Sequence, residues 1–197
     1  TSARQPSSPA ATNMRAIRGS AGSRASRSPR RVSFRWSSIA PMIPGSVSSA
    51  IAAVMPVARL QYVGLSHFEA DECGAINEFL AVAPNAVPVC SRVAAMTSVN
   101  DFADRRPRVL ADKEELDLGH HRVRWFDTPH VPHGWDCGLL METSTRTFLC
   151  GDLFTQGGAG GTPLTESDIL GPSEAFRAPM DYFAHAPGTG AILERLA

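Results

Sequence analysis

The stretch Leu60-Gln-Tyr-Val-Gly-Leu-Ser-His-Phe-Glu-Ala-Asp-Glu-Cys-Gly74 decides the fold, because an apolar run changes there into a polar cluster. Residues Leu60–Leu65 are typical of a short buried strand. The cluster that follows offers four side chains able to bind a metal: His67, Glu69, Asp71 and Glu72. Because alternate residues of an extended turn point the same way, His67 and Glu69 can converge on one ion. Asp71, at the start of the following helix, can face a second ion from the other side.

Outward from this stretch, the sequence predicts an α/β protein. Strands and helices first alternate, and the pattern then changes to consecutive strands before it becomes helical again. The expected elements are a helix at 74–83, a strand at 87–90, a helix from 91 to 96, a strand at 121–126, a hairpin of 138–142 with 146–150, a glycine loop at 157–161, and helices at 173–185 and 190–196. The Thr-Ser-Thr turn between the two hairpin strands supports their pairing.

Two further polar groups stand directly after predicted strands. The strand at 121–126 leads into a loop in which His130 and His133 alternate with prolines, and the prolines limit its freedom. Asp152 follows the last strand of the hairpin. Layered folds collect their sites at strand ends, so we expect these groups to lie near the first cluster. We favour His133 as a residue that hydrogen-bonds a metal ligand. The two alternatives are that it is a substitute ligand or a plain loop residue.

Three motifs taken together resemble the metallo-β-lactamase superfamily. They are H-x-E-x-D-x-x-G from residue 67, T-P-H-x-P-H-G from residue 128 and L-C-G-D-x-F from residue 149. The likeness is greatest to the oxygen-binding di-iron domains of flavodiiron proteins and covers roughly residues 60–160. It implies an αββα sandwich with two metal ions at the edge of its two sheets. We expect this domain to be incomplete at both ends, because neither the family's first strands nor its last metal-binding histidine is recognised.

The resemblance also implies the metal ligands, by position. They are His67, Glu69 and His130 for the first iron, Asp71 for the second, and Asp152 as the carboxylate that bridges both. Glu72 stands where the family often has histidine, so it is either an additional oxygen ligand or a solvent-facing bystander. Hydrolytic members have histidine in place of Glu69. A mixed carboxylate and imidazole set suits iron or manganese, whereas a set richer in nitrogen favours zinc. No catalytic residue is expected apart from the ligands.

Three classes of function follow from this site. The favoured one is a di-iron oxidoreductase that binds dioxygen or nitric oxide and takes electrons from an external donor, since no flavin domain is expected in this chain. The second is a zinc or manganese hydrolase of a thioester, ester or phosphoester, in which the metals activate water. The third is a metal or oxygen sensor that binds without turnover. A homodimer is compatible with each of them.

The charge distribution separates an N-terminal segment from the rest of the chain. Residues 1–60 hold nine arginines and no acidic residue, whereas the remaining residues hold ten basic and nineteen acidic ones. We therefore expect residues 1–45, rich in Arg and Ser, to be disordered or outside the domain, which would span 46–197. A transit peptide for an organelle and a fragment or out-of-frame sequence explain this segment equally well. Nucleic-acid binding is less favoured, because no motif supports it.

The remaining composition indicates a soluble protein of the cytoplasm, or of an organelle if residues 1–45 are a transit peptide. The four cysteines are spread singly, which favours buried thiols in a reducing compartment over a disulfide framework. The longest apolar stretch, near 48–57, is too short to cross a bilayer. We expect neither a membrane nor a nucleic acid as partner, and a small molecule as substrate.

Overall fold

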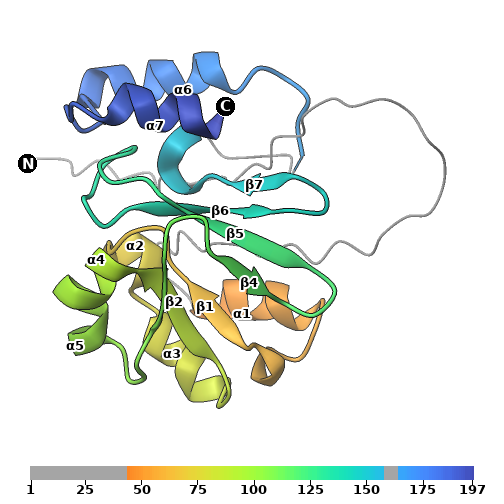
Figure 1. The fold of residues 1–197 in the computed structure, drawn as a ribbon. Helices are drawn as coiled ribbons and strands as arrows, with labels where there is room; N and C mark the ends of the chain where they lie inside the picture. The colour runs from red at the N-terminus through yellow and green to blue at the C-terminus, as the bar shows by residue number, and fades with distance from the viewer. Residues whose placement is uncertain (1–43, 158–163) are drawn as a thin grey trace, which may run out of the picture.

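The computed structural model describes residues 44–157 and 164–197, which form two β-sheets flanked by helices (Figure 1). The expected non-domain segment 1–45 lies almost wholly outside the described residues, as does most of the glycine loop at 157–161. The domain boundary therefore stays a prediction. Among the described residues, none of the helices combines the length and the apolar character needed to cross a membrane.

The first sheet contains three parallel strands in the order β1 (Tyr62–Gly64), β2 (Val87–Ser91) and β3 (Arg108–Leu110). Parallel neighbours need a crossover connection, and helices supply both connections here. The connecting helices are α2 (Ala70–Cys73) and α3 (Ile76–Val82) before β2, then α4 (Arg92–Ala94), the π-helical turn η2 (Ala95–Val99) and α5 (Asn100–Phe102). Upstream of β1 lie α1 (Pro44–Ala52) and the 3-10 turn η1 (Val57–Arg59).

The second sheet contains four antiparallel strands in chain order, which consecutive turns can connect. They are β4 (Glu115–Asp117), β5 (Arg122–Asp127), β6 (Gly138–Glu142) and β7 (Thr147–Leu149). After β7 come the 3-10 turn η3 (Gly151–Phe154), helix α6 (Leu170–Arg177), the 3-10 turn η4 (Ala178–Met180) and helix α7 (Thr189–Leu196).

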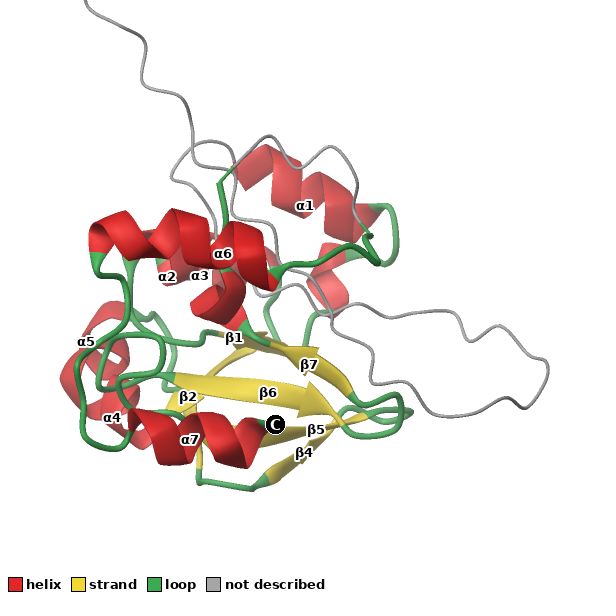
Figure 2. Cartoon of the chain, turned by 90° about the horizontal axis from the view of Figure 1, so that it is seen from above, coloured by secondary structure: helices red, strands yellow, loops and turns green. Residues whose placement is uncertain are grey.

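The sheets and helices form four layers. Apolar side chains from both sheets share one buried cluster, which includes Val89 and Leu110 of the first sheet with Trp125 and Leu140 of the second. Because successive residues of a strand face opposite sides, Leu139 points away from Leu140 and joins a second cluster. That cluster includes Ile192 and Leu196 of α7, which lies across the second sheet (Figure 2). The predicted αββα arrangement is thus confirmed.

Gly138 gives the buried indole of Trp125 room against β6. A Cβ at this position would lie 2.0 Å from Cζ2 of Trp125, whose side chain is fully buried. The first residue of β6 therefore has to be a glycine for the core between the sheets to close. Its N–H also donates to the carbonyl of Ser66, 2.8 Å away, so the same residue connects the second sheet to the end of the first.

The structure corrects two of the element predictions. The helix expected at 173–185 ends early, because Pro179 interrupts the pattern and Asp181 adopts a left-handed conformation with φ of 49°. The strands β3 and β4 were not predicted. Each has three residues, which is too short for an alternating pattern to stand out from a loop.

Candidate metal centre

Four side chains converge at one end of the two sheets. They are His67, Glu69, His133 and Asp152, and one ligand atom from each lies within 4.8 Å of the others. The shortest contacts are from the glutamate to both imidazoles: Oε2 is 3.4 Å from Nε2 of His67, and Oε1 is 3.3 Å from Nε2 of His133. Two imidazoles and two carboxylates at these separations make a set that one cation can join.

Asp152 closes the group from the second sheet. It belongs to η3, directly after β7, and is buried. Its Oδ2 lies 3.9 Å from Nε2 of His67 and 3.8 Å from Nε2 of His133. Thr155 donates a hydrogen bond of 3.3 Å to the other oxygen, Oδ1. Asp152 thus turns one oxygen toward both histidines and holds the other against its own turn.

Hydrogen bonding determines which nitrogen His67 presents to the group. The Ser66 hydroxyl donates to Oε2 of Glu72 at 3.1 Å and lies 2.8 Å from Nδ1 of His67. With its one hydrogen given to Glu72, the hydroxyl must accept from Nδ1–H, so Nε2 is the nitrogen that a neutral His67 would offer to a metal. That Nε2 is buried without a hydrogen-bond partner among the described residues. A buried nitrogen of this kind fits a metal ligand, because the metal would satisfy it.

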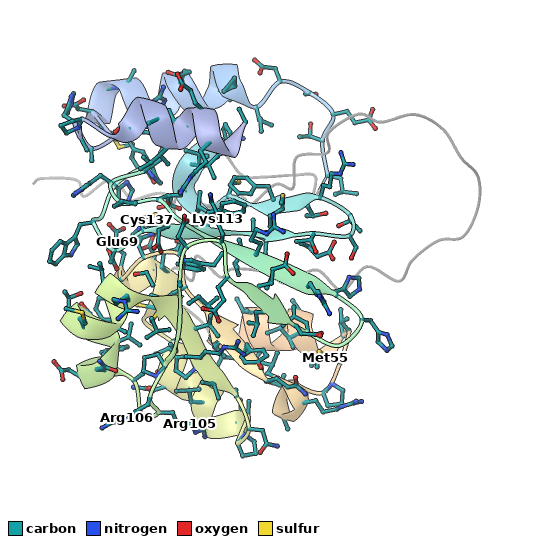
Figure 3. All side chains as sticks on the ribbon, in the orientation of Figure 1. Met55, Glu69, Arg105, Arg106, Lys113 and Cys137 are labelled. Atoms are coloured by element: carbon teal, nitrogen blue, oxygen red, sulfur yellow. The ribbon has the colours of Figure 1, made fainter. Side chains whose placement is uncertain are left out.

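The pKa values of His67 and Glu69 show that the group favours a positive charge at this point. Burial acts to lower the pKa of His67, but its contacts with Cys137 and Glu69 outweigh burial and raise that pKa to about 11. The nearby imidazoles of His133 and then His67 hold the pKa of Glu69 well below its usual range. Glu69 and Cys137, which both contact His67, are labelled in Figure 3. A bound cation would take the place of the proton that these carboxylates attract.

Asp136 fastens the two ligand loops to each other. Its buried carboxylate accepts a 2.8 Å hydrogen bond from the N–H of Phe68, the residue after His67. Its carbonyl accepts another, also 2.8 Å, from the hydroxyl of Ser91 at the end of β2. Local sequence patterns gave no sign of this role, because the partner of Asp136 lies 68 positions away in the chain.

Gly134 lets the second loop approach the first. Its φ of 74° lies in the left-handed region, which glycine adopts without strain. A Cβ there would lie 3.0 Å from Oδ1 of Asp136 and 3.6 Å from Cβ of His67. The glycine after His133 is therefore the feature of the sequence that could have singled out this histidine.

The structure brings together three of the residues expected as ligands, His67, Glu69 and Asp152, and places His133 beside them. His130 lies outside the group and is exposed; its φ is 65° and its N–H donates to the carbonyl of Gly134. The physical reason is the buried Val131 between the two histidines, which turns inward and leaves His130 on the outer side of the loop.

The two acidic residues of α2 also lie outside the four-residue group. Asp71 is half-buried in the first turn of the helix. Glu72 is buried, and burial, followed by the nearby charge of Asp152, raises its pKa to about 8. Glu72 is thus a neighbour of the group and not a solvent-facing bystander.

Comparison with known sequences gives one curated relative. No family model matches the chain. Diflavin flavoprotein A 4 of Nostoc sp. (strain PCC 7120) is 31% identical over 106 residues, which are 53% of this chain and 18% of the relative. The chain therefore spans less than a fifth of the curated relative that it matches.

Solved structures show which fold this is. The crystal structure of a fragment of diflavin flavoprotein A 5 from Nostoc sp. PCC 7120 matches with a TM-score of 0.57 and 22% identity, over 67% of this chain and 53% of that one. A metal-soaked Flv1 flavodiiron core from Synechocystis sp. PCC6803 matches with a TM-score of 0.53 and 19% identity, over 75% and 45%. The chain has the fold of the flavodiiron cores. The fold implied by the resemblance of the three motifs is thereby confirmed.

The flavodiiron-type fold also agrees with the position of the four-residue group. Its four residues come from the ends of β1, β5 and β7, at one edge of the two sheets, where the resemblance implied the metals to lie. The chain spans about half of each of these cores, so the activity of the whole relatives is carried over only as a proposal.

Proposed function

We propose that the chain is the metal-binding core of a flavodiiron-type enzyme that reduces dioxygen or nitric oxide. The single observation that carries this proposal is the convergence of two imidazoles and two carboxylates within 4.8 Å on a flavodiiron-type fold. The mixed set favours iron, with manganese next, over the zinc that a nitrogen-richer set would select. Glu69 supplies the carboxylate that makes the difference.

The four converging residues would hold the first metal, and a second would be shared through Asp152. Asp71 and Glu72, in the first turn of α2, are the candidates to complete the second position. When bound, the metals supply a site for the small oxidant and pass electrons to it. The residues themselves hold the metal and determine from which side it can be reached.

The group has a closed side and an open side. His67 has 1% of its side chain exposed and Asp152 has 7%, whereas His133 has 21% and Glu69 has 45%. A small molecule would therefore approach between Glu69 and His133, while the side lined by His67 excludes water. The electrons would come from a separate redox protein or from a flavin-bearing partner.

The proposal is tested by oxygen uptake of the purified chain after anaerobic loading with iron. Reduced flavin serves as the electron donor, and the matched control is His133→Ala. We expect uptake that depends on iron and is lost in the variant. Protein that retains zinc alone and consumes no oxygen contradicts the proposal. Hydrolysis of a thioester with zinc or manganese would instead select the hydrolase of the same superfamily, and tight iron binding without turnover would select a sensor.

A further inference from the structure

A C-terminal segment that passes over the ligand loops contributes a tyrosine to the metal centre. After η4, residues 181–185 run past the second loop, and the N–H of Ala184 donates a 2.8 Å hydrogen bond to the carbonyl of Pro132, the residue before His133. This backbone contact fixes the segment next to the site. It also places the side chain of Tyr182 over the four-residue group.

Tyr182 contacts two of the four converging residues. Its hydroxyl donates to Oδ2 of Asp152 at 2.9 Å, and Oδ2 is the oxygen that faces both histidines. Its ring meets the imidazole of His133 edge-on, with ring centroids 4.7 Å apart and planes at 88°. One side chain thus restrains the direction of a carboxylate oxygen and the tilt of an imidazole.

We propose that Tyr182 is a positioning residue, which orients Asp152 and His133 toward the metal and weakens the charge donation of Asp152. The ring contact limits rotation of His133. The hydroxyl stabilises negative charge on Oδ2, so less of that charge is available to a cation. A metal bound here is thereby favoured in its lower oxidation state. The inference rests on the metal site of the proposed function, and it deepens that function by naming what adjusts the metal.

Two contacts of Asp152 make the proposal specific to one oxygen. Tyr182 donates to Oδ2, which faces the histidines, whereas Thr155 donates to Oδ1, 3.3 Å from its hydroxyl. The Tyr182 hydroxyl also lies 3.5 Å from Oγ1 of Thr155, farther than from Oδ2. Removing the tyrosine hydroxyl therefore acts on the oxygen that faces both histidines. Removing the threonine hydroxyl changes the oxygen turned away from the histidines.

The test uses Tyr182→Phe, which removes the hydroxyl and keeps the ring against His133. Tyr62→Phe is the matched control, since Tyr62 is the other tyrosine of the chain and lies in β1. Cobalt(II) affinity and its visible spectrum are measured first, and the midpoint potential of the iron-loaded protein second. We expect Tyr182→Phe to bind cobalt(II) roughly tenfold more weakly, with an altered spectrum and a more negative potential. Tyr62→Phe should match the original protein in all three.

A second variant keeps the test decisive if Tyr182→Phe does not fold. Thr155→Val should weaken cobalt(II) binding by less than about threefold and leave the potential unchanged, because it acts on Oδ1. A potential that shifts as much in Thr155→Val as expected for Tyr182→Phe overturns the proposal. So does a Tyr182→Phe protein that is indistinguishable from Tyr62→Phe. If the original chain binds cobalt(II) and only these differences are missing, the proposed function stands. If it binds no metal, both fail.

Discussion

The two ends of β6 each carry a contact between a histidine and a carboxylate, yet the ends differ in kind. At the hairpin end, Glu142 accepts hydrogen bonds from the N–H groups of Ser144 and Thr145, at 3.1 and 2.7 Å, and lies 3.3 Å from Nδ1 of His121. At the other end, beyond Gly138, lies the four-residue metal group. The first contact belongs to a turn, and the second to a site.

The difference lies in how the polar atoms are satisfied. The carboxylate of Glu142 is matched by donors from its own turn, so nothing further is needed there. At the metal group, carboxylates and imidazoles all face one another, and Nε2 of His67 is buried without a hydrogen-bond partner among the described residues. A histidine beside a carboxylate therefore indicates little by itself. Several cation ligands that converge on a shared point, with one left unsatisfied, indicate a metal site.

The largest effect on stability is expected at Gly138, in the strand that joins the two ends. We expect Gly138→Ala to lower the free energy of unfolding by about 3 kcal/mol, because its Cβ would overlap the buried Trp125. Urea denaturation measures it. Gly190→Ala is the control, since a Cβ there meets nothing within 4 Å, and a helical alanine should stabilise by up to about 1 kcal/mol. Equal stability of the two variants would show that the core between the sheets is not packed as described.

The end that carries the metal group can be tested by replacing His130 and His133, one at a time, with alanine. We expect His133→Ala to weaken cobalt(II) binding by more than about 100-fold, which exceeds the usual loss from an outer hydrogen-bond partner. His130→Ala should change affinity by less than about threefold, because that side chain is exposed and outside the group. Titration followed in the visible spectrum measures both. The opposite ranking would restore His130 as the ligand.

A smaller effect is expected where Asp136 joins the ligand loops. Asp136→Ala removes the acceptor for the N–H of Phe68, so we expect about tenfold weaker cobalt(II) binding. The same variant should lose about 1–2 kcal/mol of stability, since a buried donor is left unpaired. Asp136→Asn keeps an acceptor oxygen and should retain most of the affinity. An alanine variant with unchanged affinity would show that the loops hold their positions without this bond.

The turn end should respond to pH and not to metal. Burial acts to raise the pKa of Glu142, but hydrogen bonds from Thr145 and Ser144 outweigh it and hold that pKa at about 2, below the ordinary 4.5. Ionised Glu142 therefore stabilises the folded chain above pH 4.5, and this contribution is lost as pH falls toward 2.

We expect Glu142→Gln to be about 1 kcal/mol less stable at pH 7, with the difference vanishing at low pH. Urea denaturation across this range measures it, with Glu194→Gln as control, since Glu194 of α7 is exposed. A difference that grows on acidification would contradict the assigned sign.

The first ligand loop could be predicted from the sequence because a local rule determines it. A strand that ends at Leu65 directs alternate residues the same way, so His67 and Glu69 were expected to converge, and both lie in the four-residue group. Asp152 was placed by the same reasoning, as the polar residue directly after an apolar strand. Local alternation and strand ends thus carry three of the four converging residues.

The second loop could not be predicted in this way, because tertiary contacts determine its path. His130 and Gly134 both adopt positive φ, and Val131 between them is buried. No periodicity in the sequence reports such a turn, so the choice between His130 and His133 stayed open to error. Asp136 accepts its hydrogen bond from Phe68 of the distant first loop, and local patterns do not reveal such a contact.

In the C-terminal part, tertiary contacts also limited the prediction of secondary structure. A single helix was predicted for 173–185, and the break after Pro179 brings Tyr182 over the site instead. Pro179 is a local signal of this break, whereas the apolar spacing alone could not locate it. The tyrosine became visible as part of the metal centre only once the path of the backbone was known.

The most direct test of the central claim is elemental analysis of the chain purified without added metal, beside His133→Ala prepared in the same way. The convergence of His67, Glu69, His133 and Asp152 leads us to expect at least one iron per chain in the original protein and a large loss in the variant. Zinc alone would contradict the choice of iron. No transition metal in the original protein, or equal metal in both proteins, would contradict the metal centre itself.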